Sequence, residues 1–236
     1  MPEKTDLIGE GKAKKIYATD DPTKLIFYFK DDATAFNAQK KGTIESKGEL
    51  NLLISARLFR LLESEGIDTH FIEEKNEREM LVERLEIIPI ETVVRNIVCG
   101  SLQKRTGHPE GEELARPIVE FYYKSDELGD PMINDDHCLV FDWATHGELE
   151  EIRHQAHAVN AVLKPFMAER GILLVDFKLE FGRTHDGRVL LGDEICPDTC
   201  RFWDSKTHKK LDKDRFRHDL GDVEGAYQEI ARRVAN

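Results

Sequence analysis

The 236-residue sequence has no long apolar run, only four cysteines and no excess of positive charge. Since no stretch approaches membrane-spanning length and the N-terminus has no signal-peptide core, we expect a cytoplasmic protein without a membrane partner. The formal net charge of −12 argues against a nucleic-acid partner, which would require a basic face. An acidic protein can still bind phosphates where its basic side chains converge on one cleft.

Several familiar functional motifs are also missing. Cys196 and Cys200 are not in the CxxC spacing of redox or zinc sites, and free thiols are the default in a cytosolic protein. The Walker A pattern GxxxxGK[ST] is absent. So are the HRD and DFG triplets of protein kinases. These absences exclude the commonest nucleotide-binding signatures but not nucleotide binding itself.

The hydrophobic patterns predict an α+β protein with two lobes. Strands are expected at residues 12–18, 24–30, 80–85, 91–95 and 172–181. Helices are expected at residues 47–66, 148–170 and 212–234, with Gly66 and Gly171 as stops and Pro165 as a bend or break. The lobes should meet near residues 85–90 without a flexible linker, which divides the chain into residues 1–88 and 89–236.

The most informative segment is 176–194, where charged and apolar residues alternate over 176–181 and the dipeptide Asp186-Gly187 follows. This dipeptide is preferred in two-residue hairpin turns, and counting outward from it places Glu180 opposite Asp193. Facing Cβ atoms lie about 4.5–5.5 Å apart, so the two carboxylates would repel unless they shared a proton or a hard cation. This favours a Mg²⁺ site. The alternative is a solvated strand face with neighbouring basic residues.

Two segments are candidate anion sites. Residues 9–17 place two glycines and three lysines at a turn before a strand, although a basic surface strand is the alternative. Residues 95–105 combine Arg95 with Gly100-Ser101, which would begin a short helix with Ser101 as its N-cap. The alternative there is an ordinary capped helix beside an exposed arginine. Farther along, Asp198 and Arg201 either bind a polar substrate or pair with each other.

Six ordered segments together resemble one family over nearly the whole chain. They are GKAKKIY (11–17), VVRNIVCGSLQKR (93–105), DPMIN (130–134), VDFKLEFG (175–182), GDEICPDTCRFWD (192–204) and DKDRFR (212–217). The family is phosphoribosylaminoimidazole-succinocarboxamide synthase, or SAICAR synthetase. The resemblance implies a two-lobed α+β fold, distantly like protein kinases, with ATP in the cleft between the lobes. It also implies a homodimer.

The implied reaction joins L-aspartate to carboxyaminoimidazole ribonucleotide (CAIR) with ATP and Mg²⁺ in purine biosynthesis, through an acyl phosphate. By motif position, Lys12, Ala13 and Lys14 would contact ATP phosphates, and the hinge 82–87, with Val82, Glu83 and Ile87, would contact adenine. Glu180 and Asp193 would hold Mg²⁺, and Arg95, Ser101 and Arg201 would bind the 5′-phosphate of CAIR. Lys178, Asp176 and Lys124 would act at the reacting end, together with Asp198.

Two departures and two rival functions remain at this point. Cys99 and Cys196 stand where the family pattern leads us to expect a smaller residue, which would add thiol sensitivity. A kinase and a nucleotide-binding sensor without catalysis are the other functions compatible with a glycine-bearing turn above a carboxylate cluster. A requirement for aspartate would separate the ligase from both.

Overall fold

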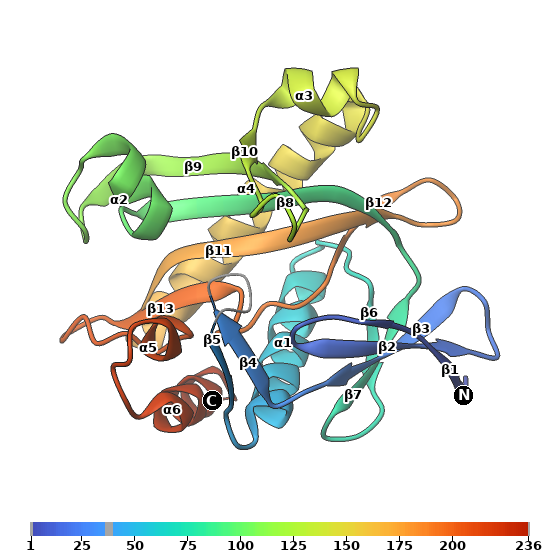
Figure 1. The fold of residues 1–236 in the computed structure, drawn as a ribbon, viewed down its shortest axis with the longest axis horizontal. Helices are drawn as coiled ribbons and strands as arrows, with labels where there is room; N and C mark the ends of the chain where they lie inside the picture. The colour runs from blue at the N-terminus through green and yellow to red at the C-terminus, as the bar shows by residue number, and fades with distance from the viewer. Residues whose placement is uncertain (1, 36–39, 236) are drawn as a thin grey trace.

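Two large antiparallel sheets frame the molecule in the computed structural model, which describes residues 2–35 and 40–235 (Figure 1). The first sheet contains β1 (Lys4–Glu10), β2 (Lys14–Thr19), β3 (Lys24–Phe29), β7 (Glu79–Glu83) and β6 (Phe71–Glu74), in that order. A separate two-stranded ribbon pairs β4 (Asp32–Ala35) with β5 (Lys40–Thr43). The strands expected in this half are confirmed, with small shifts at their ends.

The second sheet is built around a long buried strand, β11 (Ile172–Arg183). The strand order is β10 (Met132–Ile133), β9 (Glu113–Tyr123), β8 (Glu86–Ile97), β11 and β12 (Val189–Gly192). On the edge of β11 away from β8, β12 pairs with residues 180–183, and β13 (Cys200–Asp204) pairs with residues 172–177. The segment 193–199 therefore leaves the sheet edge midway along β11.

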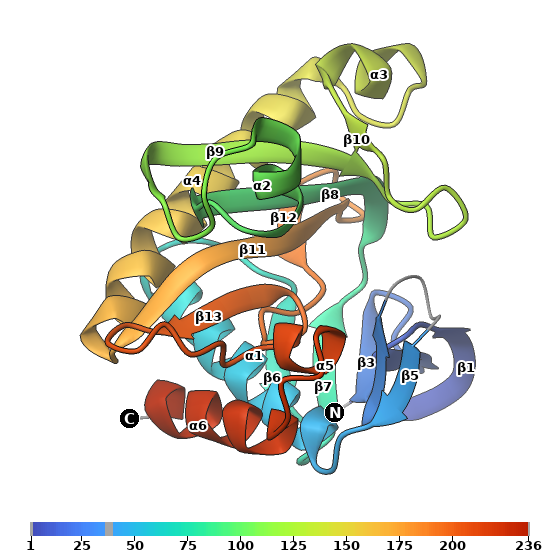
Figure 2. The same ribbon diagram turned by 60° about the vertical axis from the view of Figure 1, so that its left-hand side comes forward.

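Helices pack on the two sheets and against each other (Figure 2). They are α1 (Lys47–Ser64), α2 (Gly100–Thr106), α3 (Asp135–Val140), α4 (His146–Glu169), α5 (Asp214–Arg217) and α6 (Val223–Ala235). Helix α4 packs against β11, and α1 packs against β3 and α6, so one continuous apolar core joins the two halves. Within the described ranges, no helix is long and apolar enough to cross a membrane.

Helices α1 and α4 confirm the sequence predictions, because left-handed Gly66 (φ 81°) and Gly171 (φ 68°) follow directly after their last turns. Pro165 does not break α4, which continues to Glu169. The single last helix expected over 212–234 is wrong. Asp219, Gly221 and Asp222 have positive φ angles, and this turn separates α5 from α6.

The predicted register of the β11–β12 hairpin is also wrong, by one residue. Glu180 pairs with Gly192 rather than with Asp193. The cause is the loop, in which the Thr184 N–H donates to the Arg188 carbonyl (2.9 Å) and Gly187 adopts φ 84°. The loop therefore holds three residues, with glycine in the left-handed position, instead of the two-residue turn that Asp-Gly favours.

Candidate active site

A cleft bordered by both sheets contains two adjoining cavities. The larger, of about 540 Å³, lies between the β1–β2 turn, β11 and the segment after β12. The smaller, of about 310 Å³, lies over the β8, β11 and β13 strands. The residues that line both cavities are Lys12, Glu91, Asp130, Lys178, Asp198, Thr199 and Lys213. Because they share this border, the two cavities form one continuous site.

Glu180 lies in the larger cavity, and only 3% of its surface is exposed. Lys124 donates to both of its carboxylate oxygens (2.7 and 2.8 Å), and Lys178 donates to Oε1 at 2.7 Å and to Glu91 at 2.8 Å. Burial alone would lower the pKa of Lys178, but Glu180, Asp193 and Glu91 outweigh it and raise the pKa well above its usual value. Lys178 is therefore charged, and a solvated strand face is ruled out for Glu180.

Asp193 lines the same cavity as Glu180 although the two residues are not cross-strand partners. It lies just beyond the end of β12 in the left-handed conformation (φ 60°), and Lys14 of β2 donates to both Asp193 and Glu194. Burial would raise the pKa of Asp193, but Lys14, Lys178 and Lys124 hold it well below its usual value. The acidic side chains thus come together by a backbone reversal after the strand.

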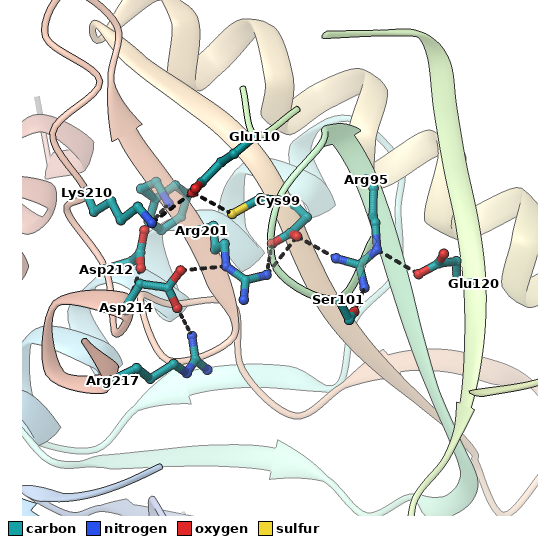
Figure 3. Close-up of polar contacts among 12 residues, drawn as sticks. Arg95, Cys99, Ser101, Glu110, Glu120, Arg201, Lys210, Asp212, Asp214 and Arg217 are labelled. Carbon is teal, nitrogen blue, oxygen red and sulfur yellow. Dashed lines mark hydrogen bonds and ion pairs between the residues drawn. The ribbon is translucent and has the colours of Figure 1, made fainter. Parts of the chain in front are cut away.

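Arg95 and Arg201 both line the smaller cavity and lie side by side, with Ser101 next to Arg95 (Figure 3). Strand register brings them together, since Asp176 is in register with Arg95 on β8 and with Arg201 on β13. The Asp176 carboxylate accepts from Arg95 Nη1 at 2.7 Å and from Arg201 Nη1 at 2.9 Å. Arg95 also donates to Ser101 (2.9 Å) and to Glu120 (2.6 Å).

Acidic residues of the segment 212–217 hold Arg201 in place (Figure 3). Asp214 accepts from Arg201 Nε at 2.8 Å and from Arg217 at 2.6 Å. The buried Asp212 carboxylate accepts the N–H groups of Phe202 (2.9 Å) and Asp214 (2.7 Å), which fixes the loop to β13. Within the described part of the chain, Arg201 Nη2 has no hydrogen-bond acceptor, so one guanidinium edge is available to an anion.

The prediction that Ser101 is the N-cap of α2 is wrong. The N-cap is Cys99, which makes no side-chain capping bond, and α2 begins at Gly100. Ser101 instead accepts a hydrogen bond from Arg95, so the two residues do meet as the sequence suggested. Gly100 has φ 58°, and a Cβ atom there would lie 2.8 Å from Arg201 Nη2. Only glycine therefore allows α2 to begin this close to the guanidinium.

The residues expected to contact ATP divide into two groups. Lys12, Ala13 and Lys14 line the larger cavity, at the turn between β1 and β2. Glu83 and Ile87 line an adjoining apolar cavity of about 210 Å³, together with Ile16, Leu25 and Phe27. Val82 does not line it; its side chain is fully buried within the first sheet.

Asp198 borders both cavities, but its carboxylate is bound within the protein. Lys47, which is fully buried at the start of α1, donates to Oδ2 at 2.6 Å, and the hydroxyl of Tyr227 on α6 donates to Oδ1 at 2.6 Å. Burial would raise the pKa of Asp198, but Lys213 and Lys47 lower it. Asp198 therefore does not pair with Arg201, and it connects the cleft to two helices.

Several cleft residues escaped the sequence-based assignment of roles. Glu91, Glu194, Lys213, Asp214 and Arg217 all contact the predicted residues or line the cavities. The last three belong to the DKDRFR segment, and Glu194 follows Asp193, so the motifs contained a signal for four of them. His70 lacked any such signal. Burial and the nearby Lys14 lower its pKa to about 3, so the ring is neutral.

The four cysteines are buried and free. Burial raises the pKa of Cys99 to about 12 and also raises that of Cys196, which disfavours the reactive thiolate. The thiol sensitivity expected for these two positions is therefore not supported by their surroundings. Among residues 2–35 and 40–235, no three or more His, Cys, Asp or Glu side chains are grouped to hold a metal ion.

Comparisons with known proteins agree with one another. The model of the SAICAR synthetase family matches residues 7–234. A phosphoribosylaminoimidazole-succinocarboxamide synthase of Chlorobium limicola is 58% identical, with 98% of each chain covered. A crystal structure of the enzyme of that name from Ehrlichia chaffeensis has a TM-score of 0.96 at 48% identity, with 98% of each chain covered.

A structure described as SAICAR synthetase in complex with ADP has a TM-score of 0.93 at 54% identity and covers 96% of each chain. These similarities extend over nearly the whole sequence and involve the fold as well as the residues. The chain therefore belongs to the SAICAR synthetase family, the ATP-dependent ligases of purine biosynthesis.

Proposed function

We propose that this chain forms an amide between CAIR and L-aspartate, converting ATP to ADP and phosphate and yielding SAICAR. The continuity of the two cavities carries the proposal. One contains carboxylates and lysines suited to nucleotide phosphates, and the other contains paired arginines suited to a sugar phosphate. The relative described as a complex with ADP supports nucleotide binding, which we assign to the larger cavity.

The chemistry requires activation of a carboxylate, whose oxygen is a poor leaving group. A CAIR carboxylate oxygen attacks the γ-phosphorus of ATP, and the bond from phosphorus to the β,γ-bridging oxygen breaks to release ADP. The aspartate amine then attacks the acyl phosphate, loses a proton and expels phosphate. Such reactions depend on positioning and charge compensation more than on a protein nucleophile, which matches a cleft rich in lysine and arginine.

In this assignment, ATP lies in the larger cavity. Lys12, Ala13 and Lys14 contact its phosphates, and the adenine occupies the apolar cavity beside Glu83 and Ile87. Val82 contributes as packing behind this cavity, because its side chain is buried in the sheet. We also propose a division into lobes near residue 88, because the chain passes from the first sheet to the second at residues 84–85 and then enters β8.

Glu180 and Asp193 would hold Mg²⁺. Magnesium typically takes one or two carboxylates and completes its shell with water and substrate phosphate, so two acids that line one cavity fit this ion. When bound, the ion would neutralise charge on the phosphates. Lys14, Lys124 and Lys178, which now contact these acids, are placed to turn toward the transferred phosphoryl group.

The reacting end lies where the two cavities meet. Lys178 lines both cavities, and Lys124 donates to the same carboxylate, Glu180, as Lys178 does. Both ammonium groups can therefore stabilise negative charge at the CAIR carboxylate. The carboxylate of Asp176 accepts hydrogen bonds from both Arg95 and Arg201, so it would act at the reacting end by holding these two arginines. Asp198 would hold the segment between the two cavities in place, because its carboxylate is bound by Lys47 and Tyr227.

Arg95, Ser101 and Arg201 would bind the 5′-phosphate of CAIR. We expect Arg201→Met to raise KM for CAIR at least ~10-fold, because a charge-assisted contact to the phosphate is lost, while KM for ATP stays within about twofold. Steady-state kinetics with each substrate varied would measure this. Arg188→Met, in the exposed β11–β12 loop, serves as the matched control. A change confined to the ATP KM would place the phosphate site elsewhere.

The function itself is tested by measuring ADP release with CAIR and aspartate added separately and together. We expect release only when both are present, with stoichiometric SAICAR. A kinase would not require aspartate, and a sensor would bind ATP without turnover. Either result would overturn the proposal.

We also propose a homodimer. Exposed apolar side chains gather in one segment around β10 and α3, namely Leu128 (64% exposed), Met132 (50%), Val140 (74%) and Phe141 (59%). This segment lies at the edge of the second sheet (Figure 1), and such patches commonly mark protein interfaces. We expect a dimer in sedimentation-velocity experiments and a shift toward monomer in Phe141→Asp. A monomeric wild-type protein would contradict this.

A cytoplasmic location is proposed as well. Four free thiols are typical of a reducing compartment, and the substrates are cytosolic metabolites in this assignment. Cell fractionation against a cytosolic marker tests this, and recovery with membranes would refute it.

A further inference from the structure

His70 lies just before β6 and joins two strands that border the nucleotide cavities. Its N–H donates to the carbonyl of Leu191 on β12 at 2.8 Å. Its own carbonyl accepts from the N–H of Glu83 at the end of β7 at 2.7 Å. The backbone of this one residue therefore links the first sheet, at the proposed adenine hinge, to the strand that ends at the acidic segment.

The side chain of His70 makes a third link. Its Nε2 lies 3.1 Å from the carbonyl oxygen of Asp193, and because a carbonyl only accepts, Nε2 carries the hydrogen. The ring is 2% exposed and makes edge contacts with Phe27 and Phe59, each with ring centroids 5.4 Å apart. These contacts fix the ring and aim its N–H at the backbone of Asp193.

Asp193 needs such a constraint. A non-glycine residue at φ 60° is uncommon, and although aspartate tolerates this conformation better than most residues, contacts to its backbone help to hold it there. The reversal at this residue carries the Asp193 carboxylate into the cavity with Glu180, rather than to the side of the sheet that strand alternation would dictate. The hydrogen bond from His70 is made to the peptide that forms this reversal.

We propose that His70 is a positioning residue that holds the Asp193 carboxylate in the phosphate cluster and couples it to the hinge at Glu83. The inference rests on the proposed function, because it assigns His70 a task in the assembly of the magnesium–nucleotide site. His70 does not contact the reacting atoms. Its effect is exerted through the conformation of Asp193.

The experiment compares His70→Gln with His70→Met. The two side chains have similar length, but only Gln has an N–H group to offer to the Asp193 carbonyl. We expect H70M to lower kcat about tenfold or more, because the hydrogen bond that positions the backbone of Asp193 is lost, with KM for CAIR within about twofold. H70Q should recover most of the loss. If H70M does not fold, H70F, which keeps the ring volume, takes its place.

A second readout does not depend on turnover. Calorimetric titration would measure ADP affinity with and without Mg²⁺ for each variant. We expect the gain in affinity from Mg²⁺ to fall about tenfold in H70M and to persist in H70Q. Because His70 also lines the proposed adenine cavity, this gain is taken within each variant, as the ratio of its ADP affinities with and without Mg²⁺. Phe59→Leu is the packing control, since it loosens the same ring pocket without removing the hydrogen bond, and it should retain the magnesium effect.

Equal losses in H70Q, H70M and F59L would show that ring packing alone matters and would overturn the inference. Wild-type behaviour of H70M would also overturn it. If the wild-type protein binds Mg²⁺ and ADP but releases no ADP with CAIR and aspartate, the proposed reaction fails. The titrations would still decide whether His70 positions Asp193.

Discussion

Replacing Glu180 by Gln is expected to lower kcat by a factor on the order of 100 or more, because the ligand set for a charged phosphoryl group is broken. The substitution removes one negative charge from a buried site, leaving Lys124 without its carboxylate partner and Lys178 with only Glu91. The same result is expected for Asp193→Asn, which leaves Lys14 with Glu194 alone. ADP release under saturating CAIR, aspartate and ATP would measure both effects.

The matched control is Glu148→Gln. Glu148 is also a partly buried, ion-paired acid, but it binds Arg183 and the N-terminus of α4, away from the cleft. Its kcat should equal that of the wild type. If Glu180→Gln and Asp193→Asn retain turnover close to that of this control, the two carboxylates are not part of the catalytic site. Circular dichroism and thermal melts would confirm that all three variants fold.

Replacing Lys47 by Met is expected to destabilise the protein by about 3 kcal/mol, the usual result of removing one partner of a buried ion pair. Lys47 is fully buried, and its partner Asp198 would keep only the Tyr227 hydroxyl and Lys213, whose ammonium is 3.8 Å away. Guanidinium unfolding would measure the free energy difference. A melting temperature lower by roughly 10 °C should accompany it.

A double variant separates loss of the charge pair from loss of packing. Adding Asp198→Asn to Lys47→Met removes the unpaired buried charge, so the double variant should be more stable than the sum of the two single changes predicts. Additive losses would show that the two side chains act independently. Lys24→Met is a suitable control, because Lys24 forms a partly exposed ion pair with Asp21 at the surface and should change stability by no more than about 1 kcal/mol.

Local patterns predicted most of the secondary structure. The helical spacing of apolar residues and a glycine stop located α1 and α4. A run of strand-forming residues located β3, and an apolar run followed by alternation located β11. The failure over 212–234 has a local cause as well. Asp219 and Asp222, which lie on either side of Gly221, have positive φ angles. Aspartate tolerates this conformation, and the spacing of apolar residues does not indicate it.

The sequence predicted which residues belong to the candidate site more accurately than it predicted how they contact one another. Arg95 and Ser101 do meet, but through a hydrogen bond from the guanidinium rather than through a helix cap. Glu180 and Asp193 do share a cavity, although the register that suggested it is wrong. Asp198 borders the cleft, but nothing in its local sequence indicates that Lys47, 151 positions earlier, is its partner.

The sequence by itself determined the elements that neighbouring residues can specify, and its motifs identified the family and most of the residues in the cleft. Only the tertiary structure decided which charges face one another. Lys14 meets Asp193, Lys47 meets Asp198 and His70 meets the Asp193 carbonyl across gaps of more than a hundred residues. Such pairings follow from how two sheets and two helices pack, because burial makes each isolated charge or polar group costly until a distant partner satisfies it.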